Sequence, residues 1–233
     1  AYYGGAVFGI LRAEVVCLNT NFSFNVARYG GGAVMMSNLG RLSVRGGVIN
    51  RNEVTGSIWP MGGGGVHCHE MVSCMYERTR VSNNRAWWGG GIMQYRGDLN
   101  FSYSLLTNNQ ATGTGGGLRI HGNTGRLNIS HSIVGNNSAL GGGGMQIDCI
   151  ATLEYCIIER NSLSGQMLGH GGAGVWVEFW HLVDSFRIVE CSFNFNMAGY
   201  RRGHHLFTSG AHVKRIVIIN TDFSNSSNAH NFG

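Results

Sequence analysis

The chain has 233 residues, of which 43% are hydrophobic and 12% are charged, and it contains 38 glycines but one proline. The glycines fall in phase with apolar residues, so the composition excludes a disordered or low-complexity chain. The net charge of +5 comes from scattered arginines, with no basic run and no aromatic–basic interleaving, which argues against a nucleic-acid partner.

A glycine run followed by an apolar residue begins at residues 4–7 and recurs along the chain. The apolar residues that close these runs lie 26 to 32 residues apart and are Val7, Val34, Val66, Ile92, Leu118, Met145, Val175 and Leu206. A period in this range is typical of solenoids and related repeat arrays. It overrides the two domains that the length would allow, and we predict a single β-solenoid domain over residues 1–233.

A second signature, apolar-x-x-Asn, follows each of the first seven glycine runs. Its asparagines are Asn25, Asn52, Asn84, Asn109, Asn137, Asn161 and Asn196. Between the two signatures, strict apolar alternation such as Leu99-x-Phe101-x-Tyr103 predicts strands, three per repeat, and no segment has a convincing helical period. We therefore expect an all-β fold, a right-handed parallel β-helix of about eight coils stacked at ~4.8 Å, with the asparagines forming a ladder at one corner.

Two rows of side chains should point outward from the strand after each glycine run. The first row is largely apolar and includes Phe8, Met35, Met93, Trp176 and Phe207. An exposed apolar row would be an interaction surface for sugars or for another chain. The alternative is that a loop covers the row.

The same face carries Arg119, His121, Asp148 and Glu178 on adjacent coils. Parallel β-helix polysaccharide lyases and glycoside hydrolases use such rows for general acid–base chemistry. The alternative is a solvated sheet face with cross-strand ion pairs, and we take the enzymatic interpretation second. His67 also lies on this face, but the neighbouring rows supply no good further zinc ligand, so neither a metal nor another cofactor is expected.

Cysteines and sequons bear on the compartment. Cys156 and Cys191 occupy the same small corner position on successive coils, ~4.8 Å apart and near disulfide range, so they are a candidate disulfide. Inward-facing Cys17, Cys68 and Cys74 are expected to be buried thiols. Five N-x-[ST] sequons are candidate glycosylation sites at Asn21, Asn100, Asn128, Asn136 and Asn225. Together they favour an extracellular or cell-surface location, and no apolar stretch approaches the ~20 residues of a transmembrane span.

The pairing of GGAV at 4–7 and 31–34 with FSFN at 22–25 and FNFN at 193–196 resembles the GGA[ILV] and FxxN repeats of the polymorphic outer-membrane protein family. The resemblance covers essentially the whole chain. It implies a parallel β-helix of the kind found in autotransporter passenger regions and implicated in adhesion. The sequence departs from the pattern by often using GGG for GGA, and Val, Leu or Ile for Phe.

Two functions follow as hypotheses. The first is a non-enzymatic extracellular structural or adhesive solenoid with glycans as candidate ligands, and the second is a carbohydrate-active enzyme. Neither end of the repeat array carries a polar cap, and joining residue 233 to residue 1 of another copy continues the repeat in phase. We expect the end coils to meet another copy head to tail, as in a fibre, or to meet neighbouring coils of a longer chain.

Overall fold

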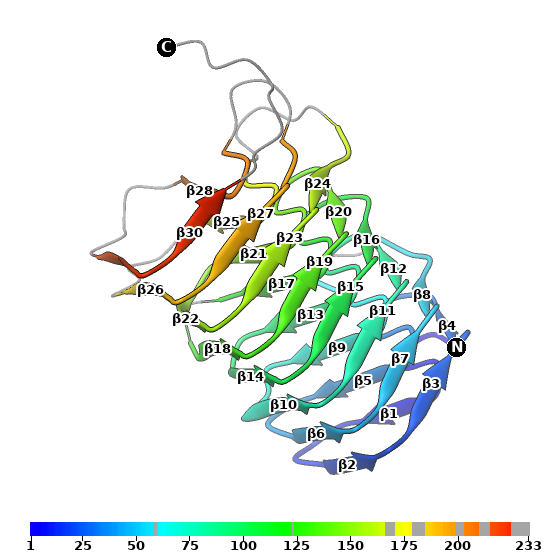
Figure 1. The fold of residues 1–233 in the computed structure, drawn as a ribbon. Helices are drawn as coiled ribbons and strands as arrows, with labels where there is room; N and C mark the ends of the chain where they lie inside the picture. The colour runs from blue at the N-terminus through cyan, green and yellow to red at the C-terminus, as the bar shows by residue number, and fades with distance from the viewer. Residues whose placement is uncertain are drawn as a thin grey trace.

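The computed structural model describes residues 1–57, 60–122, 124–165, 171–178, 185–198, 203–209 and 215–224. Over these ranges the chain is all-β, and its strands stack in parallel as a β-solenoid (Figure 1). Three sheets contain eight strands each, one from every coil, so the prediction of a parallel solenoid of about eight coils is confirmed.

The first sheet follows the glycine runs. Its strands are β1 (Val7–Gly9), β5 (Val34–Ser37), β9 (Val66–His69), β13 (Ile92–Tyr95), β17 (Leu118–His121), β21 (Met145–Ile147), β25 (Val175–Glu178) and β28 (Leu206–Ser209). The second sheet consists of β2 (Glu14–Leu18), β6 (Arg41–Arg45), β10 (Ser73–Glu77), β14 (Asp98–Ser102), β18 (Arg126–Ser130), β22 (Ile150–Glu154), β26 (Phe186–Val189) and β29 (Ile216–Ile219).

The third sheet precedes the asparagine corner. Its strands are β3 (Asn21–Ser23), β7 (Val48–Asn50), β11 (Arg80–Ser82), β15 (Leu105–Thr107), β19 (Ile133–Gly135), β23 (Ile157–Glu159), β27 (Ser192–Asn194) and β30 (Asp222–Ser224). A fourth sheet of two-residue strands was not predicted, because two residues are too few to show alternation. It consists of β4 (Val26–Ala27), β8 (Glu53–Val54), β12 (Arg85–Ala86), β16 (Gln110–Ala111), β20 (Ser138–Ala139) and β24 (Ser162–Leu163).

The core is a continuous column of inward side chains from the first three sheets. On the fourth coil Ile92, Leu99 and Leu106 are fully buried and belong to one cluster with their counterparts above and below. Each strand pairs with the equivalent residue of the next coil, for example Leu99 with Leu127. Stacking therefore buries an apolar face that one coil could not bury alone.

The asparagine ladder is present from Asn25 to Asn196. The side-chain oxygen of Asn109 accepts from the backbone N–H and the side-chain amide of Asn84, both at 3.0 Å. The side-chain amide of Asn109 donates to the Val81 carbonyl at 3.0 Å and to Asn137 at 3.1 Å. Every coil thus satisfies, at this corner, backbone groups that a turn would leave unpaired.

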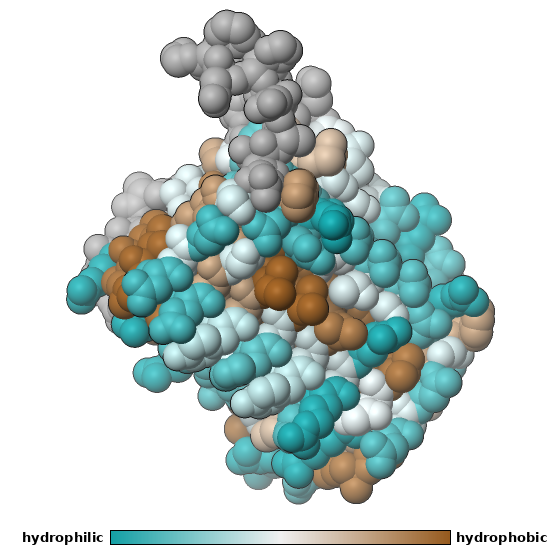
Figure 2. Space-filling model, viewed as in Figure 1, coloured by the Kyte–Doolittle hydropathy of each residue, from teal (hydrophilic) through white to brown (hydrophobic). Residues whose placement is uncertain are grey.

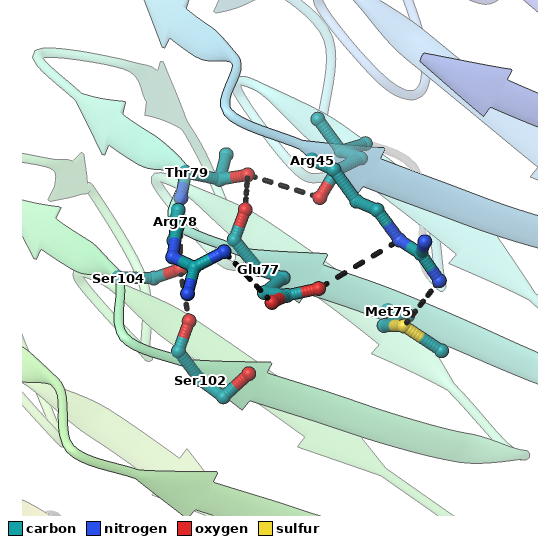
Figure 3. Close-up of polar contacts among 8 residues, drawn as sticks. Arg45, Met75, Glu77, Arg78, Thr79, Ser102 and Ser104 are labelled. Carbon is teal, nitrogen blue, oxygen red and sulfur yellow. Dashed lines mark hydrogen bonds and ion pairs between the residues drawn. The ribbon is translucent and has the colours of Figure 1, made fainter. Parts of the chain in front are cut away.

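A second ladder occupies the corner between the second and third sheets. The hydroxyl of Ser104 accepts from the Thr79 backbone N–H at 2.9 Å, and that of Ser132 accepts from the Ser104 N–H at 3.1 Å. Figure 3 shows Thr79 and Ser104 on adjacent coils of this ladder, with the Thr79 hydroxyl directed to backbone carbonyls.

Cys156 and Cys191 continue this ladder as free thiols, so the predicted disulfide between them is wrong. The sulfur of Cys191 accepts from the Cys156 N–H at 3.4 Å, while the Cys156 thiol is directed to the Glu154 carbonyl at 3.1 Å. Each sulfur takes the place of a serine oxygen in the ladder, and the two thiols are not covalently bonded. The disulfide lies elsewhere, between Cys68 and Cys74, which the sequence analysis treated as thiols.

The glycine runs form the corner before the first sheet. Gly115 has φ +69°, in the left-handed region, and a Cβ on Gly116 would overlap the carbonyl oxygen of Gly143 on the next coil. A close approach between coils therefore requires glycine here, and the run marks a corner of the backbone.

Candidate functional site: the outer face of the first sheet

The first outward row of the first sheet is buried over most of its length. Met35, Met93 and Trp176 are 4%, 0% and 1% exposed, so the prediction of an apolar interaction surface is wrong for these three residues. Phe8, at the first coil, is 51% exposed, and Phe207 is partly buried. The alternative of a covered row describes the centre of this face.

On coils two, three and five the cover comes from the start of the glycine run and the residue just before it. A side chain at Gly30 would collide with the His67 imidazole and the Met35 sulfur. The N–H of Gly62 donates to His67 Nδ1 at 3.4 Å. These segments fold back over the row, and the first sheet is consequently packed on both faces.

Arg119 lies in this covered row. Its Nη1 donates to the Thr114 hydroxyl at 2.6 Å, and its guanidinium carbon lies 5.8 Å from the Trp88 ring. Burial lowers the pKa of Arg119 to about 10, and the nearby carboxylates of Glu178 and Asp148 oppose that shift. The arginine therefore remains cationic at neutral pH and places a positive charge beneath the polar outer row.

His121 and Asp148 form the central contact of the second outward row. His121 Nδ1 lies 3.0 Å from Asp148 Oδ2, and the Asp148 side chain is 1% exposed against 19% for His121. A buried carboxylate beside Nδ1 orients the imidazole, which is the arrangement that supports a general base at Nε2.

Glu178 completes the predicted group of four. Its carboxylate accepts a short hydrogen bond from the Gln146 side-chain amide, which occupies the first outward row. The structure thus brings Asp148 to His121, and places Asp148 and Glu178 within electrostatic range of Arg119. The predicted residues form one polar group on coils five to seven.

An aromatic stack that sequence analysis did not identify continues this group towards the first coil. The His69 and Tyr95 rings are stacked with centroids 5.0 Å apart, and the Tyr95 and His121 rings are stacked at 5.8 Å. All three side chains are partly exposed. We call His69, Tyr95, His121, Asp148 and Glu178 the polar column. Their equal spacing after each glycine run places all five in the predicted second outward row, whereas the stacking of the rings was not predicted.

Arg96 borders the polar column and balances its charge. Its guanidinium lies 5.1 Å from the centre of the Tyr95 ring and pairs with Glu70 at 3.0 Å. A shallow groove of about 390 Å³ begins beside this ion pair, lined in part by Met71, Val72 and Asp98. The column is therefore continuous with a hollow at the corner between the first and second sheets.

Among the residues that the structure describes, no group of three or more His, Cys, Asp or Glu side chains is placed to hold a metal ion. His67 and His69 approach each other edge to face at 5.8 Å, and His67 is fully buried. Nor does the described part of the chain contain a helix that is long and apolar enough to cross a membrane.

Four of the five candidate glycosylation asparagines lie on the surface of described segments. Asn21, Asn128 and Asn136 are exposed and Asn100 is partly buried. Asn128 donates to Asn100 at 3.0 Å across two coils of the second sheet. Asn225 lies outside the described residues.

The chain matches no family model, and no curated protein or solved structure shows significant similarity to it.

Proposed function

We propose that this protein is an extracellular adhesive β-solenoid that binds an extended, hydroxyl-rich polymer, a glycan, along the outer face of the first sheet. The polar column carries the proposal. It places one polar or aromatic side chain per coil at the same position on five consecutive coils, and four of the five are partly exposed, while Asp148 is buried beside His121. A linear polymer lying along the solenoid axis would meet the exposed groups one after another.

The orientation of the rings favours hydrogen bonding over ring stacking as the mode of recognition. Tyr95 is stacked between His69 and His121, with interplanar angles of 16° and 24°, so its two faces are covered by its neighbours. The rings are partly exposed and carry a hydroxyl and imidazole nitrogens. Such groups match the hydroxyls of a sugar chain.

Three observations support the extracellular part of the proposal. The Cys68–Cys74 disulfide is typical of an oxidising compartment. Three candidate glycosylation asparagines are exposed. The resemblance to the GGA[ILV]/FxxN repeats of the polymorphic outer-membrane proteins points to the cell surface and to adhesion.

Head-to-tail contact remains part of the proposal for the end coils. Ile216 and Ile218 pair with buried residues of β26 and so face inward, yet they are 39% and 46% exposed. A further coil in register, from a second copy or from adjoining sequence, would bury them and pair the open strand edges.

A carbohydrate-active enzyme, a polysaccharide lyase or glycoside hydrolase, is the second candidate. The contact between His121 and Asp148 favours it, because an oriented imidazole beside Arg119 and Glu178 supplies a base, a cation and an acid on one face. In this mechanism His121 would take a proton from the substrate, and Arg119 would stabilise the resulting negative charge.

One experiment tests both candidates. The protein is titrated with a panel of neutral and acidic polysaccharides, including pectin and alginate, and both affinity and chain cleavage are measured. Binding without cleavage, weakened about tenfold or more by Tyr95→Ala, supports adhesion. Cleavage that His121→Asn abolishes while binding persists supports the enzyme.

The matched control is Asn128→Ala, on the exposed face of the second sheet, which should leave affinity unchanged. Failure to bind any polysaccharide of the panel would remove the glycan from the proposal. Equal weakening by Tyr95→Ala and by Asn128→Ala would show that the polar column is not the binding surface.

A further inference from the structure

A second column of side chains stands at the corner between the second and third sheets, away from the polar column. Its five central members are Arg78, Tyr103, His131, Tyr155 and Glu190, one from each of coils three to seven. All have φ between +48° and +53°. Bulky side chains are uncommon in this region, and Gly46 fills the same position on the second coil. The repeated conformation places these five side chains at the same position on successive coils.

The three rings of this corner column form a continuous exposed stack. Tyr103 and His131 are stacked at 4.7 Å, and His131 and Tyr155 at 4.9 Å. Tyr103 is 57% exposed and Tyr155 is 48% exposed. About half of each tyrosine surface is therefore in contact with water.

An apolar row runs beside the ring stack. Leu105, Ile133 and Ile157 each follow a ring by two residues and point outward from the start of β15, β19 and β23. Figure 2 shows hydrophobic side chains gathered over these three strands, with hydrophilic groups around them. The rings and the aliphatic row make one contiguous patch over the same three coils, of the kind that marks an interaction site.

The patch is flanked by opposite charges along the solenoid axis. Arg45 of the second coil lies 3.7 Å from the carboxylate of Glu77, and Arg78 of the third coil lies 3.5 Å from the same carboxylate. Figure 3 shows these three side chains together. Arg80, on the third coil, is also exposed, so this end carries a net positive charge.

The other end of the patch is acidic. Glu190 is exposed on the seventh coil, while the carboxylate of Glu154 on the sixth coil lies 4.0 Å from Arg187. Glu159 pairs with its neighbour Arg160 at 3.4 Å. Counting these groups, three carboxylates face two guanidinium groups.

We propose that this patch is a two-fold interface on which a second copy of the chain packs side by side and antiparallel. In chain order the corner column runs from a basic residue, through Tyr, His and Tyr, to an acidic residue. A two-fold axis at His131 therefore places the basic end of one copy opposite the acidic end of the other. Arg78 of one copy would then lie opposite Glu190 of the other, and Tyr103 opposite Tyr155. A parallel arrangement would place like charges together. The antiparallel dimer is the isologous arrangement in which opposite charges face each other.

Charge reversal tests this geometry. Wild type should sediment as a dimer at micromolar concentration. Arg78→Glu alone and Glu190→Arg alone should each weaken dimerisation by about tenfold or more, because each places like charges together. The double variant R78E/E190R should restore most of the wild-type affinity, since the opposite charges are then exchanged. Arg41→Glu, an exposed reversal on the second sheet, is the control.

A cysteine cross-link locates the two-fold axis independently. His131→Cys should form a covalent dimer under mild oxidation, because residue 131 would face its own copy across the axis. Asn136→Cys lies on the same coil, is exposed and has φ +54°, but it stands at the next corner and should not cross-link.

Three results would overturn the proposal. One is a wild-type monomer at every concentration, another is a dimer that neither single reversal weakens, and the third is failure of the double variant to recover. Head-to-tail assembly is distinguishable, because it produces an open series of oligomers that persists in Arg78→Glu. The polar column and this patch share no residue, so loss of the dimer would not by itself change glycan binding by the polar column.

Discussion

The His67 side chain is fully buried in a row between two methionines. It pairs with Met35 on one side and with Met93 on the other, and both of these side chains are also buried. Burial lowers the pKa of His67 to about 3, and the neighbouring charge of His69 acts in the same direction. The imidazole is therefore neutral wherever the protein is folded near neutral pH.

The shifted pKa of His67 links stability to pH with a definite sign. An unfolded histidine titrates near 6.5, so between pH 6.5 and about 3 the unfolded state binds a proton that the folded state does not. Acid therefore destabilises the fold through this residue. In His67→Met, which copies both neighbours, the free energy of unfolding should fall less steeply with acid, by about 1.4 kcal/mol per pH unit.

Urea denaturation of both proteins at several pH values between 7 and 4 measures this difference. The substitution also removes the acceptor of the Gly62 N–H, so we expect a pH-independent loss of about 1–3 kcal/mol, and the slope of stability against pH carries the test. Parallel stability curves over the whole range would contradict a neutral, buried His67.

At the scale of the elements, the corners hold the coils together. The strands of one coil are short, and the asparagine ladder supplies hydrogen bonds where each coil turns between the third and fourth sheets. Asn109 contributes four of these bonds through its side chain, two accepted and two donated. It is 1% exposed, so water cannot replace a lost partner.

Asn109→Ala should destabilise the protein by at least about 3 kcal/mol, because it leaves several buried donors and acceptors unsatisfied at about 1–3 kcal/mol each. Thermal or urea unfolding measures the change. Asn128→Ala is the matched control, since that side chain is exposed and makes one hydrogen bond to Asn100; it should change stability by less than about 0.5 kcal/mol. Equal effects of the two substitutions would mean that the ladder adds nothing.

The sequence predicts the strands and corners well and the environment of the site less well. Alternation places Arg119 and His121 on one face, as the structure confirms. The same alternation says nothing of what lies above that face. The cover depends on the path of the backbone at the start of the glycine runs, such as the close approach of Gly30 to His67 and Met35, and alternation within a strand does not predict that path. For the same reason Met35, Met93 and Trp176 were expected to be exposed.

The cysteines show the same limit. Cys156 and Cys191 are one coil apart, but each sulfur takes the position of a serine hydroxyl in the ladder, where the Cys191 sulfur accepts from the Cys156 N–H, and both remain free thiols. Cys68 and Cys74 lie on consecutive strands of the same coil, β9 and β10, where both point into the core across a corner. Spacing along the axis was visible in the sequence, whereas side-chain direction at a corner was not.

At the scale of the whole molecule, the strands of the described coils pair with those of the coil before and the coil after. The eight-stranded sheets keep strict chain order from β1 to β28, from β2 to β29 and from β3 to β30. Stability in such an array is a sum over coils and their interfaces. A coil with one neighbour should therefore open more readily than a coil with two.

Native-state hydrogen exchange should show this gradient. The amides of β14 and β18, in the middle of the second sheet, should exchange about tenfold or more slowly than those of β2 and β29 at its edges. Mass spectrometry of peptides covering these strands gives the comparison. Uniform protection across all eight coils would indicate that the solenoid unfolds only as a whole.

The alignment of equivalent residues on successive coils also sets how the molecule can grow. Gain or loss of a whole repeat keeps equivalent positions of successive coils aligned. A partial repeat would shift all later side chains out of this alignment. The position of a duplication still matters: a repeat inserted between β19 and β23 would separate His131 from Tyr155, while one inserted between β3 and β7 would leave that contact intact. Length is thus free to vary in steps of one coil, and the surfaces on coils three to seven are the parts where such a step would change what the molecule recognises.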